Sequence, residues 1–196
     1  MEKFIKKSNL GIIFGTIVFV LVFLFSCYQT MTNKSLTRKS EKTLNNYASK
    51  MNEVITNIDS SNIQDKKDEI KKILDEYWAD SDSDDFSANV SYITKDQILN
   101  SFDNDPETFK KIIAATTEIE CSMGEKSKGK YFDVSCNVTN NFTYDNNAPT
   151  PDYIKFLPTY IGALSLELSI PESMQAKFKY TDGKWKICGL QTGYYD

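Results

Sequence analysis

The amino-acid sequence predicts an α+β domain carried on an N-terminal membrane helix, and three observations support this prediction. Residues 10–28, LGIIFGTIVFVLVFLFSCY, form an uncharged apolar run. Between residues 40 and 79 the apolar side chains recur with the period of an amphipathic helix, whereas after Thr116 they alternate with polar ones, as in half-buried strands. Helices followed by a set of antiparallel strands are typical of the α+β class.

The apolar run ties the chain to a membrane. As a helix, its nineteen residues span roughly 28 Å, close to the ~30 Å hydrocarbon core of a bilayer. Three kinds of anchor remain open: an uncleaved signal-anchor helix, a lipoprotein signal cut before Cys27, whose preceding residues resemble a lipobox, and a cleaved secretory peptide. We expect one continuous helix from about Leu10 to Tyr28, with the rest of the chain outside the cytoplasm.

Composition divides the chain into residues 1–30 as the anchor, 31–61 as a helical stalk and 62–196 as an extracytoplasmic domain with one core. Residues 51–196 contain fifteen lysines and twenty-five carboxylates, a local balance of −10. We therefore expect no nucleic-acid partner, because phosphate binding requires clustered cations. The stalk is basic beside the anchor, where it is either a solvated linker or a contact with anionic lipid head groups.

The residue types that the chain lacks exclude several chemistries. There is no histidine, and the single arginine, Arg38, lies in the stalk. Ser/His/Asp and Cys/His nucleophile systems and zinc sites that need histidine are therefore excluded. Asp80, Asp82 and Asp84 have the spacing of a calcium loop, but the glycine and the closing glutamate of that motif are missing. We therefore predict no metal, no cofactor and no enzymatic activity.

Amphipathic helices are predicted ahead of the strands. The first runs from Ser40 to Ile58 and ends at residues 59–62, and the second runs to about Ala79. Residues 94–97, TKDQ, form a capping box that opens a short helix, and Asp105-Pro106 opens another before the period changes at Thr116.

The first predicted hairpin joins residues 118–123 to residues 132–138 through a turn at Lys128-Gly129. If Ser127 faces Lys130, Cys121 faces Cys136. Outside the cytoplasm this pair is either a disulfide or two packed thiols.

Residues 140–151 are predicted to be a loop, followed by a short helix at 151–162 and a strand at 164–170. The closing hairpin follows from Asp182-Gly183, a type I′ turn signal. This turn pairs Tyr180 with Trp185 and Phe178 with Ile187.

This order of elements, with the closing segment KFKYTDGKWKI at residues 177–187, resembles the nuclear transport factor 2-like domains of small anchored bacterial envelope proteins. The resemblance covers about Asn62 to Tyr194. It implies a strongly bent sheet wrapped around helices to leave a cone-shaped pocket, which relatives use as an enzyme site, a ligand pocket or a docking surface. None of the acid/base residues of the enzymatic members is matched by motif here.

Two apolar groups are candidate sites. Phe178, Tyr180 and Trp185 either line the cone or belong to the core, and we expect core. The second group is a lid, a partner surface or further core: Tyr153, Phe156, Leu157 and Tyr160.

We expect a membrane-anchored domain with a non-catalytic binding or scaffold role toward another envelope protein, as in a secretion or conjugation assembly. The alternative is a small-molecule-binding or enzymatic cone-pocket protein, whose ligand the sequence does not identify.

Overall fold

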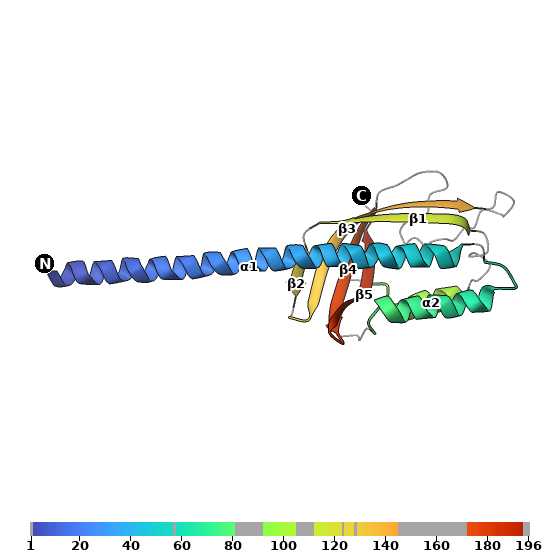
Figure 1. The fold of residues 1–196 in the computed structure, drawn as a ribbon, viewed down its shortest axis with the longest axis horizontal. Coiled ribbons are helices and arrows are strands. Elements are labelled where there is room, and N and C mark those ends of the chain that lie inside the picture. The colour runs from blue at the N-terminus through green and yellow to red at the C-terminus, as the bar shows by residue number, and fades with distance from the viewer. Residues whose placement is uncertain are drawn as a thin grey trace.

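The α+β class is confirmed. The computed structural model describes residues 2–56, 58–80, 92–104, 112–122, 124–127, 129–144 and 172–193. In these residues a curled antiparallel sheet packs against helices (Figure 1). The helices are α1 (Glu2–Ile55), α2 (Ile63–Tyr77) and α3 (Lys95–Asn104), and the strands are β1 (Ile112–Cys121), β2 (Glu125–Ser127), β3 (Tyr131–Tyr144), β4 (Glu172–Thr181) and β5 (Lys184–Gly193).

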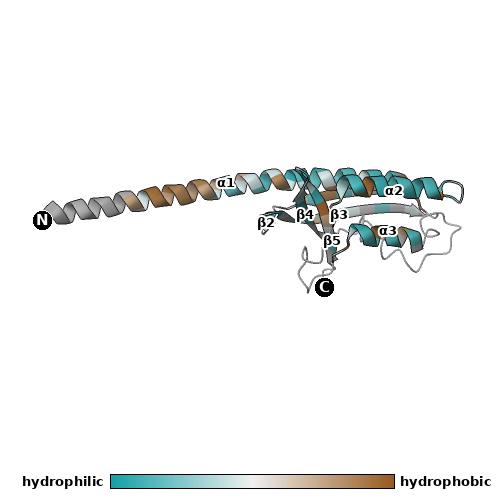
Figure 2. Ribbon diagram, turned by 90° about the horizontal axis from the view of Figure 1, so that it is seen from below, coloured by the Kyte–Doolittle hydropathy of each residue, from teal (hydrophilic) through white to brown (hydrophobic). Residues whose placement is uncertain are grey.

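Helix α1 begins at Glu2, ahead of the apolar run, and continues through that run without a break into the folded part of the chain (Figure 1). The large apolar side chains between Phe14 and Phe25 are exposed, and the hydropathy of this segment colours it brown in the ribbon of Figure 2. By length and composition, α1 is the one helix among the described residues that is able to cross a membrane. The segment from Leu10 to Tyr28, predicted as one helix, is helical throughout.

The second half of α1 differs from the prediction. We expected residues 31–61 to be a stalk outside the domain, yet the apolar stripe of this segment is buried in the core, with members Leu44, Tyr47, Ala48, Met51, Val54, Ile55 and Ile58. Leu36 is buried as well, so the core begins about two helical turns beyond the apolar run. A narrow stripe suits either a coiled-coil seam or a core helix, and here the sheet supplies the partner.

The turn between α1 and α2 forms at the predicted break. Asp59 Oδ1 accepts hydrogen bonds from the backbone N–H groups of Ser61 (2.7 Å) and Asn62 (3.0 Å). This side-chain contact fixes the chain reversal. Helix α2 then lies beside α1 and buries Ile70, Ile73 and Leu74.

The sheet has the strand order β1-β3-β4-β5, with the short β2 paired to β3. The register predicted for the last hairpin is confirmed, since Tyr180 faces Trp185 and Phe178 faces Ile187. Its turn residues, Asp182 and Gly183, have φ values of 51° and 75°, and positive φ at both positions is what a type I′ turn requires.

In the first hairpin the predicted pairing of Cys121 with Cys136 is confirmed, but the turn is wrong. Ser127 faces Tyr131 rather than Lys130. The two registers differ because Glu125 is four residues after Cys121, whereas their partners Asp133 and Cys136 are only three residues apart. The β1–β2 side of the hairpin therefore contains one extra residue. An added residue of this kind leaves the pairing before it unchanged and shifts the pairing after it by one.

Strands β1 and β3 are longer than predicted. Residues 112–116 were expected to be helical and residues 140–144 to be a loop, but these two segments pair with each other, with Thr116 opposite Asn141. The sequence of residues 112–116, IIAAT, is compatible with either helix or strand, and pairing with the neighbouring strand decides between them. The helix start predicted at Asp105-Pro106 and the elements predicted at 151–170 lie outside the described residues.

The outer edge of β5 is partly covered by residues that come shortly before position 81 and shortly after position 91 in the sequence. The N–H of Ala79 donates to the carbonyl of Ile187 (2.7 Å), and Ile93 exchanges two backbone hydrogen bonds with Leu190 (2.7 and 3.1 Å). Helix α3 follows, and the Thr94 N–H donates to Gln97 Oε1 (2.9 Å), which is one half of the predicted capping box. The C-terminal strand is therefore held within the sheet.

Candidate binding grooves beside helix α1

Polar side chains of α1 hydrogen-bond to the outer edge of β1 and the residues just after it. Because β1 is the first strand of the sheet order, no strand among the described residues lies beside this edge. Three α1 residues take that place. Thr37 Oγ1 accepts the Gly124 N–H (3.0 Å), and Glu41 Oε2 accepts the Cys121 N–H (2.8 Å). The Asn45 Oδ1 accepts the Ile119 N–H (3.0 Å), and the Asn45 Nδ2 donates to the Ile119 carbonyl (2.7 Å). The helix thus satisfies backbone groups that an edge strand leaves open.

The spacing of these residues explains why the contact forms and why it ends. Four residues of helix advance by about 6.0 Å, and two residues of antiparallel strand by about 6.8 Å. Side chains four residues apart on α1 therefore lie beside every second residue of β1 over a few such repeats. At Asn52 the contact has already changed, because its amide reaches the side-chain Oγ1 of Thr117 (3.1 Å) instead of the backbone.

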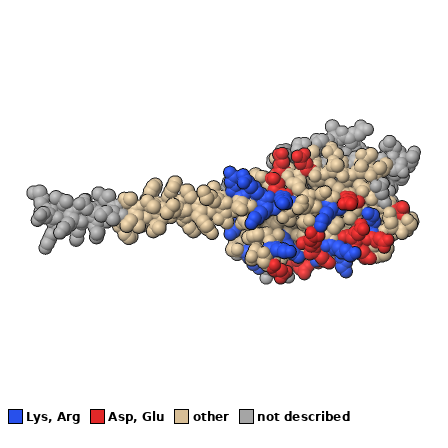
Figure 3. Space-filling view, in the orientation of Figure 1, with Lys and Arg blue, Asp and Glu red and all other residues tan. Residues whose placement is uncertain are grey.

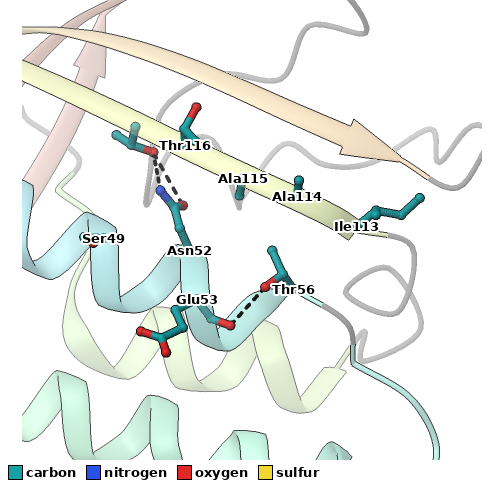
Figure 4. A pocket seen from close by; sticks show the side chains of 9 residues that line it. Ser49, Asn52, Glu53, Thr56, Ile113, Ala114, Ala115 and Thr116 are labelled. Atoms are coloured by element: carbon teal, nitrogen blue, oxygen red, sulfur yellow. Dashed lines mark hydrogen bonds between the residues drawn. The ribbon is translucent and has the colours of Figure 1, made fainter.

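Beyond this point α1 and β1 separate and leave an open groove of about 460 Å³, which we name the edge groove. Figure 4 shows Asn52 reaching toward β1 while the Glu53 carboxylate lies away from the strand. The groove is lined by Ser49, Asn52, Glu53 and Thr56 of α1 and by residues 113–117 of β1. Its walls are mostly small or neutral side chains, so a polypeptide backbone is able to approach closely.

The backbone of Ala115 faces the edge groove. Since Ile119 turns its N–H and C=O away from β3 toward Asn45, every second residue of β1 does the same, and no register shift interrupts β1 between Ala115 and Ile119. In the part of the chain that the structure describes, these outward groups of Ala115 have no hydrogen-bond partner. The exposed side chain of Ile113 lies at the same end.

A second groove, the basic groove, lies between α1 and the turn of the β4–β5 hairpin and has a volume of about 420 Å³. Helix α1 contributes Leu36, Lys39, Ser40, Lys42, Thr43 and Asn46, and the hairpin contributes Phe178, Gly183, Lys184 and Trp185. Three of these residues are lysines and none is an acid. Figure 3 shows Lys and Arg side chains gathered where α1 enters the folded part of the chain.

The three aromatic residues predicted as core or pocket have different environments. Phe178 is fully buried, Tyr180 is 51% exposed and Trp185 is half-buried against the core. The rings of Tyr180 and Trp185 are in contact, with centroids 5.3 Å apart. Phe178 is therefore a core residue, as predicted, whereas Trp185 forms part of the wall of the basic groove.

Lysine–carboxylate contacts connect the three helices. Lys95 Nζ, at the start of α3, contacts Asp75 (2.8 Å) and Asp80 (3.0 Å). The hydrogen bond from Lys95 lowers the pKa of Asp75, and the hydrogen bond from Lys50 lowers the pKa of Glu76. Because Asp75 and Glu76 are largely exposed, these contacts orient α1, α2 and α3 and add little stability.

The cysteines differ in state and surroundings. Cys121 and Cys136, left open between disulfide and thiols, form a disulfide in the structure. Cys188 is a fully buried thiol outside the disulfide, and it donates to the Lys177 carbonyl (3.4 Å) at a register shift between β4 and β5. Cys27 lies in α1 and is partly exposed.

Several predicted residues lie outside the described part of the chain. These are the apolar cluster Tyr153, Phe156, Leu157 and Tyr160, and Asp82 and Asp84 of the acidic loop. Asp80 is exposed and contacts Lys95. Among the described residues no group of three or more metal-ligating side chains is found.

The two grooves are candidate surfaces that sequence reasoning did not identify, although Phe178 and Trp185 of the basic groove were predicted as pocket or core residues. Thr37, Glu41 and Asn45 share a helix face at i, i+4 spacing, which signals a polar stripe but does not identify the strand edge that it contacts. Comparison of the chain with protein-family models, curated proteins and solved structures gives no match.

Proposed function

We propose that this protein is a membrane-anchored, non-catalytic binding module of the cell envelope, which takes an extended segment of another envelope protein into the edge groove. The observation that carries this proposal is the outward backbone of Ala115, an edge-strand position that α1 leaves uncovered. An extended peptide bound there would continue the sheet by one strand, with main-chain hydrogen bonds supplying affinity.

The packing of α1 supports binding over catalysis. A nuclear transport factor 2-like cone would hold its pocket between sheet and helices, but that space is occupied by the buried side chains of α1, among them Leu44, Tyr47 and Met51. The edge groove and the basic groove both lie at the surface. We retain the cone-like fold as part of the proposal because the sheet is curled and carries helices on one face (Figure 1).

The edge groove suits one incoming strand better than the sheet of a second copy. In a second copy, β1 is flanked by its own α1 at hydrogen-bond distance. Pairing two such edges would bring both helices into the same space. A single extended segment needs only the width between α1 and β1.

Photo-crosslinking in the native membrane tests this proposal. A benzophenone amino acid at Ile113, which is 48% exposed, should give one discrete crosslinked envelope protein. The same group at Gln64, on the exposed face of α2, should not. The substitution Ala115→Pro removes the outward N–H from an edge position where proline is tolerated, and should abolish the Ile113 crosslink while the protein remains folded.

Ala115→Ser is the matched control because it keeps the N–H and should preserve the crosslink. An unchanged crosslink in Ala115→Pro would show that the partner does not pair with β1. Crosslinking equally strong from Gln64 would place the partner elsewhere.

A further inference from the structure

The basic groove contains three lysine ammonium groups, and one of them, that of Lys184, also acts electrostatically on the Glu76 carboxylate. None of the salt bridges among the described residues involves Lys39, Lys42 or Lys184. Lys39 and Lys42 lie three residues apart on α1 and so share a face, and Lys184 approaches from the hairpin. Three positive charges on one groove, in a domain with an overall excess of acids, favour an anion there.

Ser40 provides an independent indication of a ligand. Its residue is only 4% exposed and lines the basic groove. Thr37 and Thr43, its neighbours on α1, each donate to the carbonyl four residues earlier (both 2.8 Å), but the Ser40 hydroxyl makes no such bond within the described residues. Because this hydroxyl lines the groove and makes no hydrogen bond to the described residues, it is available to donate to a ligand from outside the chain.

The third wall of the basic groove is aromatic. Trp185 is half-buried, and its ring packs against Phe132 (centroids 6.2 Å apart) and Tyr180. These contacts hold the indole in place at the wall of the groove. An aromatic ring held in a fixed position packs well against the C–H surface of a sugar or polyol. The lysines alone would not distinguish such a compound from any other anion.

We propose that the basic groove binds a phosphate ester of a sugar or polyol. The lysines neutralise the phosphate, which they bind as point charges, the Ser40 hydroxyl donates to a phosphate oxygen, and Trp185 covers the carbon skeleton. The volume of about 420 Å³ lies within the ~300–1,000 Å³ range of small-ligand sites. This inference does not depend on the edge groove, which lies further along α1.

The position of the groove on α1 bears on the source of the phosphate. Lys39 is eleven residues beyond Tyr28, or about 16 Å along the helix. The head-group layer extends only about 5–8 Å beyond the hydrocarbon core. A phosphate ester that reaches the groove from outside the bilayer therefore fits better than the head group of an ordinary phospholipid.

The test uses the full chain in nanodiscs of phosphatidylcholine, titrated with sn-glycerol 3-phosphate by calorimetry and tryptophan fluorescence. We expect saturable binding, weaker binding of inorganic phosphate and no binding of glycerol. Lys39→Gln with Lys42→Gln should weaken binding by about tenfold or more. Ser40→Ala should weaken it several-fold.

Lys71→Gln with Lys72→Gln removes the same charge from the exposed face of α2 and is the matched control, which should bind as the wild type does. Absence of saturable binding, or equal loss in both double variants, would overturn the proposal. Circular dichroism of each variant establishes that it is folded. In phosphatidylglycerol nanodiscs, a reduced apparent affinity would identify the lipid head group as the source, and an unchanged affinity would identify a source outside the bilayer.

Discussion

Asn45 is the residue whose side chain most directly replaces a neighbouring strand. Its amide makes two hydrogen bonds, of 2.7 and 3.0 Å, to the backbone of Ile119, which is 5% exposed. A primary amide has the donor and acceptor arrangement of a peptide group, so it pairs with a strand edge as another strand would. Serine or alanine at this position could not reach both groups.

Asn45→Ala should therefore destabilise the protein. Two buried backbone groups lose their partners, at a cost of about 2–3 kcal/mol after the gain in helix propensity is subtracted. Denaturant unfolding of the full chain in detergent measures the change. Asn46→Ala is the matched control, because Asn46 is exposed and lacks these bonds, and should be neutral or slightly stabilising. Equal effects of the two substitutions would show that Asn45 does not support the β1 edge.

The aromatic residues of the last hairpin should separate in the same measurement. Phe178→Ala removes a fully buried ring and should cost about 3–5 kcal/mol. Trp185→Ala should cost clearly less, because the indole is half-buried at the groove wall. A larger loss for Trp185 than for Phe178 would mean that the indole, rather than Phe178, anchors this end of the core.

At the scale of elements, the sequence-based predictions were correct where residues close together in the chain specify the structure. Asp182-Gly183 specifies its turn by backbone preference alone, and the register of β4 and β5 follows from it. Residues 112–116 have no such signal, since their strand character comes from pairing with residues far along the chain. The role of Asn45 was likewise invisible, because a polar helix residue looks the same whether it faces water or an unpaired strand.

The disulfide between Cys121 and Cys136 connects β1 to β3 at the end of β1 nearest Glu41. It closes a loop of fifteen residues, a length for which loop-closure entropy corresponds to about 3 kcal/mol. A reducing agent should therefore lower the free energy of unfolding by roughly 2–4 kcal/mol. Thermal unfolding with and without dithiothreitol checks this expectation. The variant with Cys121→Ser and Cys136→Ser should be insensitive to the reagent, and sensitivity in that variant would point to the other cysteines.

At the scale of the whole molecule, α1 joins the membrane segment to the core as one element. Its large apolar side chains from Phe14 to Tyr28 are exposed, whereas its apolar stripe from Leu36 onward is buried in the domain. Cys27 lies at the domain-proximal end of the apolar run. An uncleaved helix and a chain lipidated at Cys27 would therefore hold the domain at nearly the same distance from the bilayer, and the basic groove would keep its height above the head groups.

The last prediction concerns the stiffness of this connection. Between Met31 and Ser49 there is no glycine or proline, the usual causes of a helix kink. Eighteen residues of helix make five turns and span about 27 Å, so spin labels at these two exposed positions lie on the same face. With Cys27→Ser and Cys188→Ser to prevent stray labelling, pulsed electron resonance on the full chain in nanodiscs should give one narrow distance distribution near that value.

Inserting two glycines after Thr32 should broaden this distribution, because the connection then loses its helical constraint. A distribution already broad in the uninterrupted chain would contradict a rigid α1. The domain would then move freely above the membrane, and the distance between the basic groove and the bilayer would no longer be fixed by the helix. The preference for a phosphate ester from outside the bilayer depends on that fixed distance, so the same experiment tests the geometry on which the preference rests.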